Sequence, residues 1–347
     1  MMRGGPLRAA SRKWRIGRAP ACGNFDAIRC PVHSCGHRQG CLKIPKVGAD
    51  HESKSFELAP ATPTAWWQRV QGMLGAVAFH SRGVTSPRPV LCVGLKSSAS
   101  TWVFNVVVEI LRASRGDISQ MSRTVSPGAA FEPGGVMSFY SDAIEAFPEG
   151  AEHAGYLVIK THKPARSLRY LAGAGGAKVL ISVREPRDAV ASLMQRFDLP
   201  FETVLRDFKL SAQHVIAIAR GRPFLLLRYE DRFYENLEGV ASVAKFLGVR
   251  LNRSKIELIA RELSAEEIAL KIEQLKADGV LGPRPDANEF DRRTHLHAGH
   301  LGDGSIGKHA ALTLQQQDSV LLALRDFCRT FGYSARRAQH ITPSDDH

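Results

Sequence analysis

Long apolar runs, and acidic residues near the N-terminus, are both scarce in this sequence. No run of about 18 apolar residues occurs, so we expect no membrane span. The arginine-rich N-terminus lacks the apolar core of a secretory signal, which leaves an organelle transit peptide or a tail without fixed structure. Residues 1–50 hold ten Lys or Arg but only two Asp or Glu, which accounts for +8 of the net charge of +13. Because the rest of the chain is only mildly basic, we predict no nucleic-acid partner.

Cysteine pairs at the spacing of a strong zinc site are also missing. Four of the six cysteines lie near the N-terminus with two histidines, at Cys22, Cys30, Cys35, Cys41, His33 and His37. A zinc knuckle is one interpretation of this cluster, but without a C-x2-C pair we predict a tail and no metal. The remaining two, Cys92 and Cys328, fall in apolar patterns where free thiols usually pack. This use of cysteine fits a reducing, cytoplasmic protein.

The apolar segments predict one large α/β domain. A hydrophobic share of 44% and a charged share of 23% are ordinary for a globular protein. Short apolar runs with the length of buried strands cover Val90–Val93, Tyr156–Lys160, Lys178–Val183 and Pro223–Arg228. Helical patterns cover 186–197, 201–220 and 234–247, the last closed by Gly248. Strands that are apolar on both faces and alternate with helices form parallel sheets.

We therefore expect a parallel β-sheet flanked by helices over residues 89–335. A basic tail at 1–62 and a leading helix with a linker at 63–88 would precede it, and a second tail at 336–347 would follow. Residues 114–155 are rich in proline and glycine. They are expected to be a long connection that helps to build a substrate pocket.

Cationic and hydroxyl side chains follow the apolar runs. Lys96 and several hydroxyl residues come after the first run, Lys160 and His162 end the second, and Arg184 follows the third. The carboxyl ends of parallel strands meet at one edge of a sheet, so these groups should share a pocket. The first run leads through small residues into a helix N-terminus, which favours anions. The triphosphate-binding form GxxxxGK[ST] is absent, because Leu95 replaces the glycine before the lysine.

Three motifs make the chain resemble the sulfotransferases that use PAPS (3′-phosphoadenosine-5′-phosphosulfate). Arg184–Ser192 is similar to the family's R-x-P-x-D-x-x-x-S element. Lys160–Pro164 resembles its K-T-H-x-P turn, and Leu227–Asp231 resembles its Y-E-D segment. The resemblance covers about residues 89–333 and implies a P-loop-like, three-layer α/β fold.

The resemblance also implies a role for each matching residue. His162 would be the general base, and Lys96 and Lys160 would stabilise charge on the sulfuryl group and the leaving phosphate. Arg184 and Ser192 would hold the 3′-phosphate, and Tyr229 would lie against the adenine. The loop that binds the 5′-phosphosulfate would comprise Lys96, Ser97, Ser98, Ala99, Ser100, Thr101 and Trp102. A C-terminal loop with Gly304 and Lys308 would close on the 3′-phosphate.

Two loops depart from the family pattern. The phosphosulfate loop usually reads P-K-S-G-T-T-W, whereas here Leu95 replaces the proline, no glycine is present and one residue is added. The C-terminal loop usually reads R-K-G-x-x-G-x-W. Here Gly302 and Asp303 replace the Arg-Lys pair, and His309 replaces the tryptophan. The candidates to supply the missing charge are His300, Lys308, Arg292 and Arg293.

The sequence thus predicts a cytoplasmic enzyme that transfers a sulfuryl group from PAPS, without a metal, to an acceptor hydroxyl or, less favoured, an amine. The acceptor would be a small molecule, a glycan or a lipid, and a homodimer is an option. Two alternatives stay open. One is a P-loop kinase-like phosphotransferase, which would need a Mg²⁺-binding acid and a proper triphosphate loop. The other is a non-catalytic polyanion-binding protein that uses the basic tail.

Overall fold

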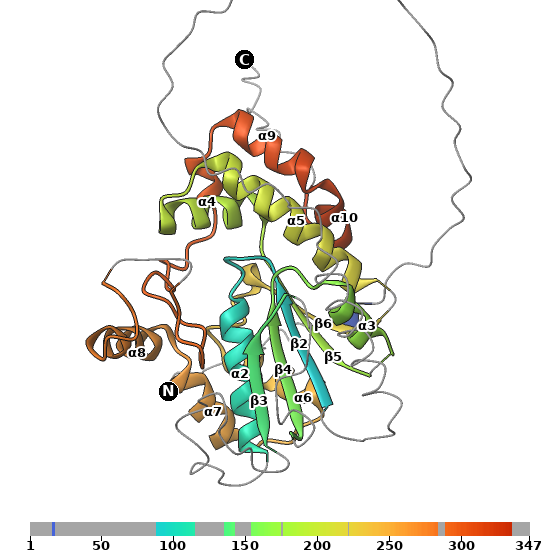
Figure 1. Cartoon of the computed structure of the whole chain (residues 1–347), viewed down its shortest axis with the longest axis vertical. Helices are drawn as coiled ribbons and strands as arrows, with labels where there is room; N and C mark the ends of the chain where they lie inside the picture. The colour runs from blue at the N-terminus through green and yellow to red at the C-terminus, as the bar shows by residue number, and fades with distance from the viewer. Residues whose placement is uncertain are drawn as a thin grey trace, which may run out of the picture.

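A sheet whose strands follow the order β1-β6-β5-β2-β4-β3 forms the centre of the protein (Figure 1). The structure, a computed structural model, describes residues 16–17, 88–114, 135–142, 154–174, 176–220, 222–283 and 289–334. The strands are β1 Ile16–Gly17, β2 Arg88–Gly94, β3 Val136–Tyr140, β4 Tyr156–Thr161, β5 Lys178–Val183 and β6 Phe224–Arg228. Strands β2 to β6 pair in parallel, and β1 pairs antiparallel with β6. The predicted parallel α/β fold is confirmed.

Helices cover both faces of this sheet. Residues of α2, α6, α7 and α8 form the core on one face, and residues of α3, α4, α5, α9 and α10 form the core on the other. Alternate residues of β2 supply both cores, because successive side chains of a strand point to opposite faces: Leu91 and Val93 enter one, Val90 and Cys92 the other. The helices are α2 Ser100–Ala113, α3 Arg166–Ala174, α4 Pro186–Phe197, α5 Phe201–Ala219, α6 Leu237–Leu247, α7 Arg253–Glu262, α8 Ala265–Ala277, α9 Leu314–Ala323 and α10 Arg325–Phe331. Short 3₁₀ turns occupy Tyr229–Asp231 and Lys308–Ala311.

The four strands and the helices that the sequence analysis named are present, but it missed the strands β1 and β3 and did not place α3 or α7 to α10. Residues 114–155 were expected to be a connection, but they contain β3, which pairs in parallel with β4 at the edge of the sheet. Helix α6 begins at 237, later than expected, because the Asn236 side chain caps it by accepting from the N–H of Gly239 at 2.8 Å. Gly248 ends this helix in the left-handed conformation, as predicted.

Several expectations lie outside the described residues. These are the tails at 1–62 and 336–347, apart from the pair Ile16–Gly17, the leading helix and linker, and the N-terminal cysteine cluster. Cys92 and Cys328 are buried and free, as predicted. Within the described ranges, no helix combines the length and the apolar character that crossing a membrane requires.

Candidate active site

The residues that follow the carboxyl ends of β2, β4, β5 and β6 line one cavity of about 760 Å³. Every site residue named from the sequence lines it except Ser98. The lining residues are Lys96, Ser97, Ala99, Ser100, Thr101, Trp102, Lys160, His162, Arg184, Ser192, Tyr229, Gly304 and Lys308. Among the other cations named as candidates, His300 lines the cavity, whereas the exposed Arg292 and Arg293 do not.

The loop between β2 and α2 is tight and holds two side chains in the left-handed backbone region. Ser97 has a φ of 62° and Ala99 a φ of 58°, where glycine would fit at lower cost. Gly94 starts the loop, and a Cβ at that position would lie 2.2 Å from Ser182 Oγ. The Ser98 hydroxyl lies within hydrogen-bond distance of the same Oγ, at 3.0 Å. Ser98 therefore braces the loop against β5 and does not face the cavity.

Helix α2 begins beside this loop without a side-chain cap, because its N-cap residue is Ala99. The N–H groups of a helix's first turn have no acceptor within the helix, and such groups bind anions. Ser100 and Thr101 line the cavity at this point. Lys160 Nζ donates to Thr101 Oγ1 at 2.5 Å. Backbone N–H groups, hydroxyls and an ammonium group are thus gathered in one place.

A carboxylate and a carbonyl fix His162 after β4. Asp142 accepts hydrogen bonds from the backbone N–H groups of His162 at 3.1 Å and of Lys163 at 3.0 Å. It also accepts from Thr161 Oγ1 at 2.8 Å. His162 Nδ1 lies 2.7 Å from the carbonyl oxygen of Gly94. Because that oxygen can only accept, Nδ1 carries the proton of the neutral ring and Nε2 keeps a lone pair.

Burial favours the neutral forms of both His162 and Lys160. Burial, followed by the charge of Lys160, lowers the pKa of His162 to about 3. Burial also lowers the pKa of Lys160 to about 7. A bound anion would favour the charged form of each group. Perturbed groups of this kind in a cavity are typical of functional sites.

Lys96 and Lys163 share one acid. The Oδ2 atom of Asp207, on α5, lies 3.2 Å from Lys96 Nζ, and the Oδ1 atom of Asp207 pairs with Lys163. Lys96 is therefore partly neutralised in this structure, although it lines the cavity.

Arg184 connects two loops across the cavity. Its guanidinium lies 4.0 Å above the ring of Tyr229, as a cation–π contact. Nη1 donates to the carbonyl of Ser97 at 3.3 Å, and Nη2 to that of Ser305 at 2.7 Å. Its buried Nε has no acceptor in the part of the chain that the structure describes. Ser192, two turns along α4, is also buried and lines the same cavity.

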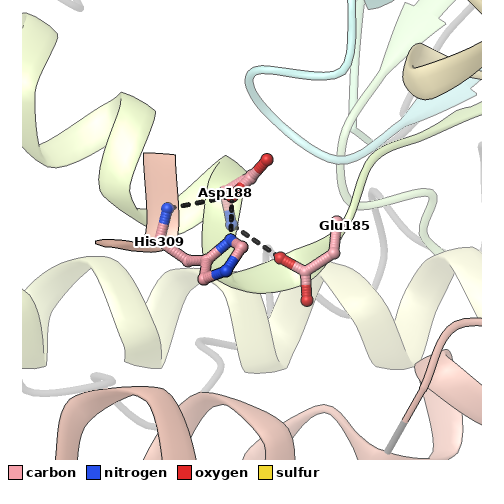
Figure 2. Close-up of side chains that lie close together, drawn as sticks. All are labelled: Glu185, Asp188 and His309. Atoms are coloured by element: carbon pink, nitrogen blue, oxygen red, sulfur yellow. Dashed lines mark hydrogen bonds and ion pairs between the residues drawn. The ribbon is translucent and has the colours of Figure 1, made fainter. Parts of the chain in front are cut away.

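Asp188 fastens the C-terminal loop to the start of α4 (Figure 2). Its Oδ2 accepts from the N–H of Gly307 at 2.7 Å, and its Oδ1 accepts from the N–H of His309 at 2.9 Å. His309 Nδ1 lies 2.6 Å from the same Oδ1. Glu185 accepts from the N–H of Asp188 at 2.9 Å. Ligand atoms of Glu185, Asp188 and His309 are near enough to one another for a metal ion, but both Asp188 oxygens are already engaged. We call the bonds of Asp188 to Gly307 and His309 the loop clasp.

The sequence analysis missed several residues of the site; of those described below, all but Asp142 line the cavity, and Asp142 holds the backbone of His162. Arg196 stands one turn after the serine of the R-x-P-x-D motif, so the helical period could have revealed it. Tyr140 and Asp142 come from β3 and its end, the strand that was missed. His295 and His297 lie on an irregular segment without a family motif. The density of histidine in that segment was the only signal.

The segment at 289–300 brings neutral imidazoles into the cavity. Asn105 on α2 holds it by donating to the carbonyl of Thr294 at 2.9 Å. The ring of Tyr140 lies 6.0 Å from the ring of His162 and 6.1 Å from that of His295. Burial lowers the pKa of His295 to about 3, and its Nε2 has no partner among the described residues.

Known proteins similar to this chain include a sulfotransferase and retinol dehydratase. A protein-family model, the sulfotransferase domain, matches residues 87–271, and no curated protein matches. A mouse sulfotransferase solved with PAP is 14% identical, with a TM-score of 0.47 over 75% of this chain and 90% of that chain. Retinol dehydratase solved with retinol and PAP is 15% identical, with a TM-score of 0.46 over 73% and 86%. Because the family match spans more than half of the 347 residues, this protein belongs to the sulfotransferase domain family and is a sulfotransferase.

Proposed function

We propose that this sulfotransferase transfers the sulfuryl group of PAPS to an acceptor hydroxyl, with an amine as the second option, and that His162 is the general base. The observation that carries the proposal is the bond between His162 Nδ1 and the carbonyl of Gly94. It fixes the tautomer and leaves the Nε2 lone pair available in a cavity that also holds Lys160. Neutral imidazole is the form that a general base requires.

The side chains at the cavity suit PAPS. The uncapped start of α2, with Ser100 and Thr101, supports binding of the phosphosulfate. Arg184, whose Nε lacks an acceptor among the described residues, and the buried Ser192 support binding of the 3′-phosphate. Tyr229 would lie against the adenine. PAPS bound here would supply the sulfuryl group and a phosphate as the leaving group.

The residues of the protein then divide the work of the reaction. His162 Nε2 accepts the proton of the acceptor hydroxyl while the Gly94 carbonyl holds the ring. Lys160 stabilises the negative charge that develops on the leaving phosphate. Negative charge in the cavity opposes the effect of burial, and therefore raises the pKa of His162 towards the range that suits a base. Asp142 keeps the backbone at His162 in place.

The acceptor end of the cavity is expected to take a hydroxyl on an apolar or aromatic body. Its lining includes Tyr140, Phe290, Leu263 and Ile268 beside the imidazole of His295. Such walls bury an apolar body, and the few polar groups orient the reacting atom. A cytoplasmic location and a homodimer stay predictions.

A thermal-shift titration followed by an acceptor screen tests the proposal. We expect PAP (3′-phosphoadenosine-5′-phosphate) to raise the Tm, because a ligand at 100 times its Kd stabilises a fold by about 2.7 kcal/mol. ATP with Mg²⁺ should leave the Tm nearly unchanged. Labelled PAPS should then transfer its label to hydroxyl acceptors.

The two alternatives predict other outcomes. A shift with ATP and Mg²⁺ but none with PAP would support a kinase-like phosphotransferase. Loss of nucleotide binding on deletion of residues 1–60 would support a polyanion-binding protein that uses its tail.

A further inference from the structure

Arg196 is the best-placed cation of the cavity that no family motif assigns. It lies on α4, one turn beyond Ser192, and therefore on the same face of the helix. Its Nη2 donates to Ser97 Oγ at 2.5 Å, and its Nη1 donates to the carbonyl of His300 at 3.0 Å. Its Nε lies 3.4 Å from the carbonyl of Ser192. The side chain of Arg196 therefore contacts three segments: the phosphosulfate loop, α4 and the C-terminal loop.

Among the described residues, Arg196, Arg184 and Lys160 are the cations of the cavity without an acidic partner, and the two arginines are those directly before α4 and on it. Lys308 pairs with Asp303 at 2.8 Å, and Lys96 pairs with Asp207 at 3.2 Å. Within the part of the chain that the structure describes, no carboxylate lies within ion-pair distance of either guanidinium. Their acceptors are carbonyls and a hydroxyl, which do not neutralise charge. Two buried or half-buried like charges without a counter-ion are unfavourable unless an anion enters between them.

The missing Arg-Lys pair of the C-terminal loop points to the same place. Gly302 stands at the first position of that pair, and a Cβ on it would lie 4.0 Å from Arg196 Cδ and 3.8 Å from Lys308 Nζ. The side chain of Arg196 therefore already occupies the space beside residue 302. Asp303, at the second position, brings negative charge and engages Lys308. Charge lost from the C-terminal loop is thus present on α4.

We propose that Arg196 is the second arginine of the 3′-phosphate site and takes the place of the family's Arg-Lys pair. Together with Arg184 and the Ser192 hydroxyl, its planar guanidinium would grip a dianionic phosphate from one side. This inference rests on the proposed function, because it assumes a nucleotide with a 3′-phosphate. A role as a mere brace between Ser97 and His300 is the alternative that the test must separate.

The test removes the guanidinium and the 3′-phosphate independently. The Kd values of PAP and of AMP, which lacks the 3′-phosphate, are measured by calorimetry for the wild type, R196Q and R196K. We expect R196Q to weaken PAP binding about 10- to 100-fold, the effect of a charge-assisted hydrogen bond, and to change AMP binding by less than about threefold. The Kd of PAP for R196K should lie between the values for the wild type and R196Q, because lysine keeps the charge but not the planar guanidinium. The control R329A removes one exposed positive charge from α10 and should change neither Kd.

Each other outcome overturns a distinct claim. If R196Q weakens PAP and AMP equally, Arg196 is only a brace and the inference fails while the proposed function stands. If the wild type itself binds PAP no better than AMP, both fail. Thermal unfolding reports whether R196Q is folded. If it is not, the Kd values of PAP and AMP are compared for R196K instead.

Discussion

Two groups of residues that line the cavity use opposite electrostatics, and we call these groups the cationic end and the histidine end. The cationic end comprises Arg184, Ser192, Arg196 and Lys308, and the histidine end comprises Tyr140, His162, His295 and His297. At the cationic end the two guanidiniums lack carboxylate partners among the described residues, so this end is suited to hold an anion. At the histidine end burial lowers the pKa of each imidazole to about 3, so this end keeps neutral lone pairs, and a bound anion that raises the pKa of His162 would suit it to take a proton.

The origin of the two ends differs as well. The two arginines and the serine of the cationic end lie on α4 or directly before it, at a strand end that a motif marks. Most of the histidine end comes from β3 and from the irregular segment at 289–300. Most of the cationic end, with the exception of Arg196, is therefore readable from sequence, whereas the histidine end apart from His162 emerges only when the chain is folded.

The largest expected effect separates the two ends by their function. His162→Gln should lower kcat by about 10²- to 10⁴-fold, as loss of a general base does, and leave the Kd of PAP within about threefold. Arg184→Gln should instead raise the Kd of PAP about 100-fold and change kcat little. Steady-state kinetics and calorimetry measure both. A His162→Gln protein that transfers sulfate at the wild-type rate would remove His162 from the mechanism.

The loop clasp should matter for the cationic end alone. Asp188→Asn keeps the shape of the side chain but removes the charge that holds Gly307 and His309, so we expect the Kd of PAP to rise about tenfold. Asp326→Asn, which removes an exposed charge on α10, is the matched control. Unchanged PAP affinity in Asp188→Asn would show that the loop clasp does not position the C-terminal loop for PAP.

The histidine end should make the fold sensitive to mild acid. Histidine in an unfolded chain titrates near 6.5, whereas burial lowers the pKa of His295 to about 3. Between these values the unfolded state binds a proton that the native state does not, so stability is lost as the pH falls below 6.5. His295→Asn should reduce the slope between pH 6 and pH 5 by about 1.4 kcal/mol per pH unit.

Urea unfolding at several pH values measures this slope. His214→Asn, which removes an imidazole on α5 outside the cavity lining, is the control. An identical slope in His295→Asn and the wild type would contradict the prediction.

The smallest effect concerns the loop between β2 and α2. Ala99→Gly should stabilise the protein by about 0.5 kcal/mol, because relief of the left-handed backbone slightly outweighs the extra freedom of glycine in the unfolded chain. Ala189→Gly, inside α4, should instead destabilise it by about 1 kcal/mol or more. Chemical unfolding of both variants tests the sign. Destabilisation by Ala99→Gly would mean that the backbone at 99 is not strained.

The sequence predicted the elements with strong local signals. Lys178–Val183 and Pro186–Phe197 agree with β5 and α4 residue for residue, because an unbroken apolar run and a proline at the first helical position are local features. It missed β3, which lies in a segment interrupted by glycine and proline. Ser98 shows a different limit, because a hydroxyl in a phosphate loop suggests ligand binding by its type. Its direction is decided by the backbone around it, and it braces the loop.

Long-range contacts explain the rest of what the sequence could not show. The bonds from Asp188 to His309 join positions 121 residues apart, and a single sequence carries no signal for such pairs. The same holds for Asn105 and Thr294, which set the position of the histidine end.

The clasp at Asp188 also imposes an order on biosynthesis. A ribosome makes the loop between β2 and α2, His162 and Arg184 first, whereas Gly307 and His309 follow Asp188 by 119 and 121 residues. A nascent chain therefore displays a half-built site that lacks its closing loop.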